Sequence, residues 1–183
     1  MAIKNQYLCV LIMGLPGSGK TTVAKILSKQ LKAVFIEADD HHSIQNIMKM
    51  SNGHPLTDLD RKKWLSSILH KARESLKSQN VVIACSALKE NYRKFLSSLN
   101  FKLVYLKIEH NLALDRILKR KNHFMPSSLL ESQIKILEEP RKALEINGNL
   151  TVNEISEIIA CRPSASMFSP KSYMGKGKIK TIS

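Results

Sequence analysis

GLPGSGKT, from Gly14 to Thr21, is the most informative segment of this 183-residue chain. It fits the pattern G, four residues, G, K, then S or T, and lies between the apolar run 7–13 and a helical segment that starts near Lys20. Such a match arises by chance in under about 1% of chains of this length. The alternative, a flexible glycine turn, is therefore disfavoured, and the sequence predicts a phosphate-binding loop.

The residue types in this loop suit the binding of a nucleotide's phosphates. Its glycines allow the backbone to bend around an anion, while backbone amides and the positive end of the following helix point at phosphate oxygens. Lys20 is predicted to bridge the β and γ phosphates, and the Thr21 hydroxyl to ligate the accompanying Mg²⁺. The predicted nucleotide contacts are Gly14, Leu15, Pro16, Gly17, Ser18, Gly19, Lys20, Thr21 and Thr22.

Five short apolar runs alternate with segments of helical spacing, at residues 7–13, 33–37, 81–85, 101–108 and, more weakly, 143–146. The runs are continuously apolar, as expected for strands of a parallel sheet covered on both faces. Thr57, Ser128 and Thr151 each stand three residues before a carboxylate, which is typical of a helix start. The pattern predicts an α/β fold with right-handed crossovers.

Composition and charge divide the chain into a domain at 1–161 and a basic tail at 162–183. With 43% hydrophobic residues, the chain is able to bury one sizeable core. The net charge is +14, of which five basic residues and no acid in the tail contribute +5, leaving +9 for the domain. The tail is predicted to be flexible, with a docking segment for an anionic partner as the alternative.

The cysteines and the apolar runs indicate a cytoplasmic protein. Cys9, Cys85 and Cys161 lack the spacing of a zinc site or a disulfide framework, which favours reduced thiols. The run 7–13 is too short to span a bilayer, so no membrane association is expected.

A phosphate-binding loop is shared by GTPases, motor ATPases, helicases and small-molecule kinases. The third apolar run ends in Ala84, Cys85 and Ser86 where motor ATPases have an aspartate, which favours a small kinase. A basic protein that binds nucleic acid is the other alternative. Only the tail is strongly unbalanced in charge and no aromatic series accompanies it, so no specific nucleic acid partner is expected.

Acidic and imidazole groups follow the second apolar run, at Asp39, Asp40, His41 and His42. This is the carboxyl edge of the predicted sheet, where ligands bind in open α/β folds. Asp39 is predicted to accept the proton of the acceptor hydroxyl and to help hold Mg²⁺. The alternative is that Asp39 or Asp40 caps the following helix. The two adjacent histidines point in opposite directions on an extended segment, which argues against a shared metal.

Five blocks in order resemble the gluconokinase family of small P-loop sugar-acid kinases. They are MGLPGSGKTT from Met13, ADDHH from Ala38, NIMKMSNGHPLTDLDRKKWL from Asn46, ACSALKENYR from Ala84 and RKNHFMPSSLLESQIKILEEP from Arg120. The resemblance implies a P-loop kinase fold with a five-stranded parallel sheet flanked by helices and a helical lid. It also implies ATP as donor, D-gluconate as acceptor, 6-phospho-D-gluconate as product, and a homodimer. Another small kinase with a shikimate-like or nucleotide acceptor is the nearest alternative.

The resemblance also assigns residues to the acceptor site. Asp39 stands where the family has its active-site acid, and Arg61 matches an arginine expected near the acceptor or the transferring phosphoryl group. A guanidinium suits the acceptor carboxylate because it presents two parallel donors. Solvated helix faces are the alternative for Arg61 and Lys49, and a helix start for Lys89. The predicted substrate contacts are Asp39, His42, Lys49, Arg61, Ser86, Lys89 and His123.

A lid is predicted at about 110–126. Arg116 and Arg120 are four residues apart on one helix face and could reach the phosphates together, and His123 matches the family's lid sequence. A basic surface helix is the alternative. The residues predicted to be catalytic are Lys20, Asp39, Arg61, Arg116 and Arg120. Ser43 and Asn122 depart from the family's proline and lid glycine, so the rigidity of both segments is expected to differ.

Overall fold

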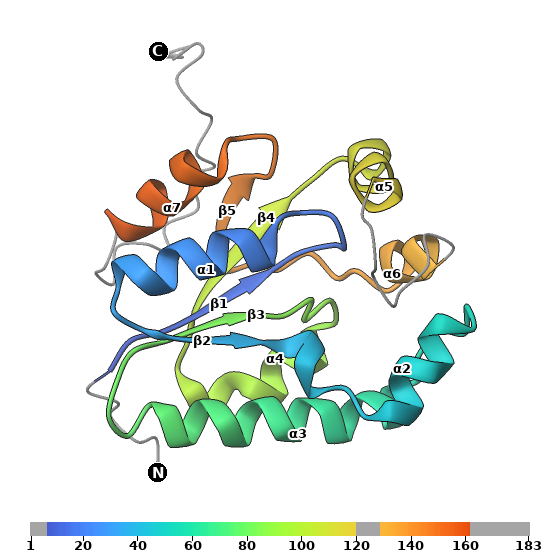
Figure 1. Cartoon of the computed structure of the whole chain (residues 1–183), viewed down its shortest axis with the longest axis horizontal. Coiled ribbons are helices and arrows are strands. Elements are labelled where there is room, and N and C mark those ends of the chain that lie inside the picture. Colours follow the sequence, from blue (N-terminus) through green and yellow to red (C-terminus); the bar gives the residue numbers. More distant parts are fainter. Residues whose placement is uncertain (1–6, 120–128, 162–183) are drawn as a thin grey trace.

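One parallel sheet of five strands forms the centre of the protein, seen here in a computed structural model that describes residues 7–119 and 129–161 (Figure 1). The strand order is β2-β3-β1-β4-β5 and every pairing is parallel. The strands are β1 Cys9–Met13, β2 Val34–Glu37, β3 Val81–Ala84, β4 Lys102–Lys107 and β5 Leu144–Asn147. The predicted fold class and its five strands are confirmed.

Helices cover both faces of this sheet (Figure 1). On one face lie α1 Lys20–Gln30 and α7 Val152–Ala160, and on the other α3 Asp58–Ser75 and α4 Glu90–Leu96. The short elements η1 Ala38–His41, α2 Ile44–Ser51, η2 Ser97–Leu99, α5 His110–Leu118 and α6 Leu130–Lys135 complete the described chain. In Figure 1, α2, α5 and α6 lie beyond the arrowheads of the strands, so these helices surround the carboxyl edge of the sheet.

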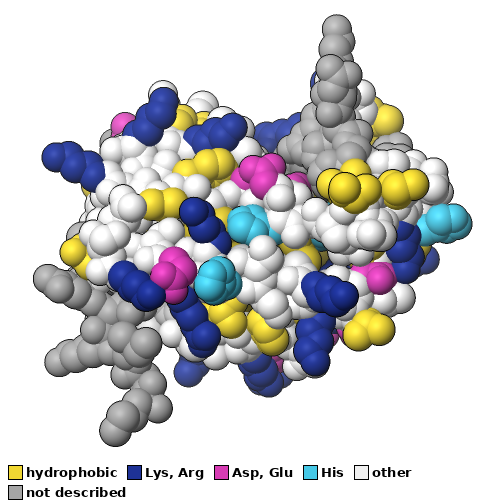
Figure 2. All heavy atoms as spheres, turned by 60° about the horizontal axis from the view of Figure 1, so that its bottom comes forward, with side chains coloured by type: hydrophobic (Ala, Val, Ile, Leu, Met, Phe, Trp, Pro, Cys, Tyr) yellow, Lys and Arg dark blue, Asp and Glu magenta, His cyan; other side chains and the backbone are white. Residues whose placement is uncertain are grey.

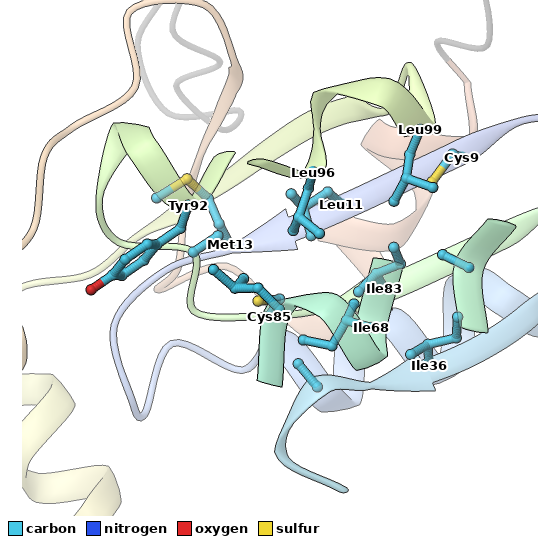
Figure 3. Close-up of a cluster of buried hydrophobic side chains, with 14 of the residues drawn as sticks. Cys9, Leu11, Met13, Ile36, Ile68, Ile83, Cys85, Tyr92, Leu96 and Leu99 are labelled. Carbon is cyan, nitrogen blue, oxygen red and sulfur yellow. The ribbon is translucent and has the colours of Figure 1, made fainter. Parts of the chain in front are cut away.

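Alternate residues of the central strand point into two separate apolar clusters. Leu11 and Met13 pack with Ile83 and Ile68 on the α3 side, as Figure 3 shows. Val10 and Ile12 belong to the cluster that contains residues of α1 and α7. Both faces of the strand are therefore buried, which explains its continuous apolar sequence.

Two of the three predicted helix starts are capping boxes. The Thr57 hydroxyl accepts a hydrogen bond from the backbone amide of Asp60, whose carboxylate accepts one from the backbone amide of Thr57. Thr151 and Glu154 form the same pair of bonds. The N-cap of α6 is Leu129, with no side-chain cap, and the predicted start at Ser128 lies outside the described residues. These caps satisfy amide groups that a helix start otherwise leaves unpaired.

The capping box at Thr57 makes a measurable prediction. Thr57→Ala is expected to lower the free energy of unfolding by about 1 kcal/mol, because the amide of Asp60 loses its acceptor. Urea denaturation followed by circular dichroism measures this change. Thr57→Ser keeps a hydroxyl and should remain within a few tenths of a kcal/mol of the wild type. Equal stability of the alanine and serine variants would contradict a capping role.

The described residues bear on the membrane and thiol predictions as well. Within 7–119 and 129–161, the helices are too short or too polar to cross a membrane. Cys9 and Cys85 are buried and Cys161 is exposed, and all three are free thiols. The proposed tail, Arg120 and His123 lie outside the described residues, as does the part of the predicted lid that follows α5 and Lys119.

Candidate active site

The loop between β1 and α1 has the backbone of a phosphate-binding loop. Gly17 has φ +83° and Gly19, the N-cap of α1, has φ +92°. Residues other than glycine rarely adopt this backbone region. A Cβ atom on Gly17 would lie 2.7 Å from the carbonyl oxygen of Ala113 in α5. Glycine is therefore required there both by conformation and by the close approach of α5.

Lys20 and Thr21 begin α1 directly after this loop. The Lys20 Nζ donates a hydrogen bond to the carbonyl oxygen of Leu15 at 3.0 Å, so the side chain folds back over the loop. The Thr21 hydroxyl lies close enough to the carboxylate of Glu37, at the end of β2, to act on its pKa. The loop therefore lies beside the end of the strand that leads into the predicted acceptor site.

Glu37 was not predicted from the sequence, although it is the charged last residue of an otherwise apolar strand. Its carboxylate lies close to the Thr21 hydroxyl and accepts a hydrogen bond from the backbone amide of Asp39 at 3.5 Å. Its Oε2 atom is buried and has no hydrogen-bond partner among the described residues. Burial, as the largest cause, raises the pKa of Glu37 above its usual value, and the nearby Asp39 charge adds to this. A partly unsatisfied carboxylate beside Thr21 suits a hard cation, which prefers oxygen ligands.

Asp39 lies in η1, half-buried, two residues after Glu37. It does not cap α2, and neither does the exposed Asp40, because the N-cap of that helix is Ser43, whose hydroxyl accepts from the amide of Asn46. The capping alternative considered for the two aspartates is therefore wrong. Ser43, which departs from the family's proline, has this structural role instead.

The two histidines of this segment both contact α3, at Ser67 and Trp64, so the expectation of opposite directions on an extended segment is not confirmed. The His41 Nδ1 atom lies 2.8 Å from the hydroxyl of Ser67. The His42 ring stacks on the indole of Trp64 with centroids 4.6 Å apart and an interplanar angle of 8°. Among the described residues, no three potential ligand side chains of His, Cys, Asp or Glu gather in a metal-binding cluster.

Burial lowers the pKa of His42 to about 4, and the charges of Arg61 and His41 act in the same direction, while Asp39 opposes them. Since the usual value is near 6.5, the unfolded chain binds a proton at this residue between pH 6.5 and 4 and the folded protein does not. The contribution of His42 to the unfolding free energy is therefore highest above pH 6.5 and decreases as the pH falls from 6.5 towards 4.

This linkage predicts a pH-dependent difference between variants. Between pH 7.5 and 5.0, the wild type should lose on the order of 1 to 2 kcal/mol more unfolding free energy than His42→Gln does. Urea titrations of the magnesium-free protein at both pH values measure the difference. His70→Gln, which replaces an exposed histidine of α3, should keep the wild-type pH dependence. Identical pH dependence in His42→Gln and the wild type would refute the buried neutral imidazole.

Arg61 is nearly buried, with 8% of its surface exposed. Its guanidinium donates to the carbonyl oxygen of Leu56 and to the Tyr92 hydroxyl at 3.4 Å, and lies 5.7 Å from the centre of the Tyr92 ring. The alternative of a solvated helix face is therefore wrong for Arg61. Its charge also acts on His42, which places it on the acceptor side of the site.

The two predicted lysine contacts are held in ion pairs with the start of α3. The Lys49 Nζ lies 2.7 Å from Asp60, and the Lys89 Nζ lies 2.8 Å from Asp58. Both pairs are partly exposed, so each is expected to contribute little to stability. They leave both lysines near the predicted acceptor site but already neutralised in part by aspartates.

Ser86 lies half-buried just after β3, in the loop that leads to α4. Arg93 of α4 holds this loop, since its guanidinium donates to the carbonyl oxygens of Ala87 and Leu88, each at 2.9 Å. Ala87 has φ +43°, a conformation that needs such support. Lys89 is the N-cap of α4 and makes no side-chain cap hydrogen bond. The alternative considered for Lys89, a helix start, is therefore confirmed.

Arg116 of α5 contacts the phosphate-binding loop from the opposite side. Its guanidinium donates to the carbonyl oxygens of Gly17 at 3.3 Å and of Gly148 at 3.1 Å. A cavity of about 260 Å³ lies beside these residues, between the loop and the start of α7. A larger cavity of about 670 Å³ lies at the ends of β4 and β5, but Leu15 is the only predicted site residue that lines it, so its position does not suit the phosphate chemistry.

Comparison with known proteins agrees with this geometry. The profile of the shikimate kinase family matches residues 16–160. The "Probable gluconokinase" of Dictyostelium discoideum is 39% identical and the match covers 85% of this chain and 82% of that protein. The "Gluconokinase" of Gluconobacter oxydans is 43% identical, covering 76% of this chain and 79% of that protein. The crystal structure of a gluconokinase from Sinorhizobium meliloti superimposes with a TM-score of 0.70 at 32% identity, covering 87% of this chain and 99% of that structure. The chain belongs to the gluconokinase family.

In this gluconokinase-family chain, the described candidate residues form two groups at one sheet edge. The residues predicted to bind the phosphate donor are the loop, Lys20, Thr21 and Arg116, and Arg116 contacts the loop at Gly17. The residues predicted to bind the acceptor, Asp39, His42, Arg61 and Ser86, lie in or after β2, in α3 and after β3. Glu37 joins the two groups, because it contacts Thr21 and the amide of Asp39.

Proposed function

We propose that this protein is an ATP-dependent gluconokinase, which transfers the γ-phosphoryl group of ATP to D-gluconate and releases 6-phospho-D-gluconate and ADP. One observation carries the proposal: the carboxylate of Glu37 lies close to the Thr21 hydroxyl of the phosphate-binding loop and accepts a hydrogen bond from the Asp39 amide. A phosphoryl donor on the loop and an acceptor at Asp39 would therefore be neighbours. The names of the relatives supply the acceptor's identity.

On the donor side, the loop amides and Lys20 hold the ATP phosphates, and the cavity beside Gly17 and Gly148 takes the nucleoside end. Thr21 would hold Mg²⁺, with Asp39 or the buried Glu37 oxygen supplying carboxylate on the same side. Bound Mg²⁺ neutralises phosphate charge during transfer. Arg116 exchanges its carbonyl contacts for phosphate oxygens.

On the acceptor side, Asp39 orients the gluconate hydroxyl and accepts its proton as the phosphoryl group is transferred. His42, neutral at pH 7, can donate or accept a hydrogen bond with another hydroxyl of the polyol. Arg61 supplies a fixed positive charge for the carboxylate, since its surroundings are largely desolvated. Lys49 and Lys89 add positive charge to the acceptor site when they give up their ion pairs with Asp60 and Asp58.

A panel of acceptors tests this proposal. Gluconate, shikimate and nucleoside monophosphates are supplied separately with ATP and Mg²⁺, and ADP release is measured. Gluconate should stimulate ADP release well above the rate with ATP alone, and the other acceptors should not. Stimulation by shikimate or a nucleotide instead would replace gluconate as the substrate. A lack of stimulation by all of them, with polynucleotide binding that weakens steeply with salt, would favour the nucleic acid alternative. On the face that Figure 2 shows, lysines and arginines are scattered and form no continuous track for a polynucleotide. This face therefore does not favour the nucleic acid alternative.

The division of the chain at residue 161 makes a separate prediction. A variant that ends after Cys161 should retain at least about half of the wild-type kcat, because the predicted site residues all lie at or before His123 in the sequence. The coupled ADP assay and a thermal melt measure the effect. A large loss of rate or of folding would show that residues 162–183 belong to the domain.

A homodimer and a cytoplasmic location complete the proposal, and light scattering of the purified protein tests the first of these.

A further inference from the structure

Trp64, the only tryptophan of the chain, contacts both ends of the segment that carries Asp39. Its indole Nε1 donates a hydrogen bond of 2.6 Å to the carbonyl oxygen of Ala38, the residue before Asp39. Its ring face stacks on His42, three residues after Asp39, with centroids 4.6 Å apart. One side chain therefore holds the segment before and after the predicted base.

The segment between these two contacts is short. It is the single 3₁₀ turn η1, in which the amide of His42 bonds to the carbonyl of Asp39 at 3.3 Å. The Asp39 amide also donates a hydrogen bond to the carboxylate of Glu37, at a long distance of 3.5 Å. Short 3₁₀ turns have poor hydrogen-bond geometry, so their orientation depends on tertiary contacts.

Trp64 itself is held firmly. It is 3% exposed, belongs to the α3-side apolar cluster and stands in the second turn of α3, a helix of 18 residues that begins with a capping box. Arg61 lies one turn earlier on the same helix and is also nearly buried. A rigid helix thus presents both the acceptor-side charge and the indole that contacts the Asp39 segment.

We propose that Trp64 is a positioning residue of the phosphoryl-transfer site, which fixes Asp39 and His42 through its indole N–H and its ring face. The inference rests on the proposed function for its kinetic consequence, but not for its structural one. A displacement of about 1 Å at a reacting group can cost about 100-fold in rate. Loss of the clamp should therefore lower kcat and leave ATP binding at the separate loop almost unchanged.

Three variants separate this role from simple core packing. Trp64→Phe keeps an aromatic face for His42 and loses the N–H, and Trp64→Leu loses both contacts. Ile68→Ala is the matched control, because Ile68 is fully buried in the same cluster one turn later and makes no hydrogen bond to the Asp39 segment. All three variants will be less stable than the wild type, so loss of stability alone does not distinguish them.

Two measurements are made on the full chain. In the gluconate assay, kcat should fall about 10-fold or more in Trp64→Leu and by a smaller factor in Trp64→Phe, with KM for ATP within about twofold of the wild type. Ile68→Ala should keep kcat within about twofold. In hydrogen exchange without ligands, amides of residues 38–42 should exchange faster in both Trp64 variants than in the wild type and in Ile68→Ala.

The outcomes are distinct. Wild-type kcat and wild-type exchange in the Trp64 variants, or equal effects in Ile68→Ala, would overturn the clamp. If the wild type shows no gluconate-dependent ADP release, the proposed function fails, and the exchange measurement alone then decides whether Trp64 holds the segment. If Trp64→Leu does not fold, the same comparison is made between Trp64→Phe and Ile68→Ala.

Discussion

Lys20→Ala is expected to reduce kcat for gluconate phosphorylation by about 100- to 1000-fold while the fold stays intact. The Lys20 Nζ lies over the phosphate-binding loop, 3.0 Å from the carbonyl oxygen of Leu15, where it would meet the β and γ phosphates of ATP. A preorganised charge at that place stabilises the transferring phosphoryl group in a way that water cannot replace. Its removal leaves the apolar clusters untouched, because Lys20 is only half-buried at the start of α1.

A coupled assay of ADP production at saturating ATP and gluconate measures this effect, and thermal melts check the fold. Lys29→Ala is the matched control, since it removes an exposed lysine from the last turn of the same helix. Its kcat should stay within about twofold of the wild type. Retained gluconate-dependent turnover in Lys20→Ala would contradict the role assigned to the loop lysine.

Asp39→Asn is expected to have the second large effect, a loss of about 100- to 10,000-fold in kcat. The amide keeps the shape of the side chain but cannot accept the proton of the gluconate hydroxyl. Stability should change little, because α2 is capped by Ser43 and does not depend on the carboxylate of Asp39. The fluorescence of Trp64, next to this segment, offers a measure of gluconate binding in the variant that is independent of turnover.

Asp40→Asn is the control for this substitution. Asp40 is the adjacent residue of the same 3₁₀ turn and is exposed, so the variant should turn over at about the wild-type rate. If the two variants lose the same amount of activity, a general effect of charge near the segment would explain both. If Asp39→Asn retains turnover, a different group accepts the proton, and Glu37 would be the first candidate because it lies beside Asp39.

The fold class, the glycine-rich loop and the two capping boxes were predictable from the sequence alone. The strands were predictable because a strand buried on both faces must be continuously apolar, as Val10 to Met13 and Val81 to Ala84 are. Gly17, Lys20 and Thr21 were recognisable because a phosphate-binding loop is built from consecutive residues. Thr57 and Thr151 were recognisable as caps for the same reason, since a capping box spans only four positions.

Which side chains share an environment at the site became visible only in the folded protein. Glu37 meets Thr21, Trp64 meets Ala38 and His42, and Arg116 meets the carbonyl of Gly17 at a separation of 99 residues. The folded protein also shows that Arg61 is buried and that Lys49 and Lys89 are paired with aspartates. The physical reason is that burial, pairing and pKa depend on which segments fold against one another, whereas periodicity and loop motifs depend only on neighbours along the chain.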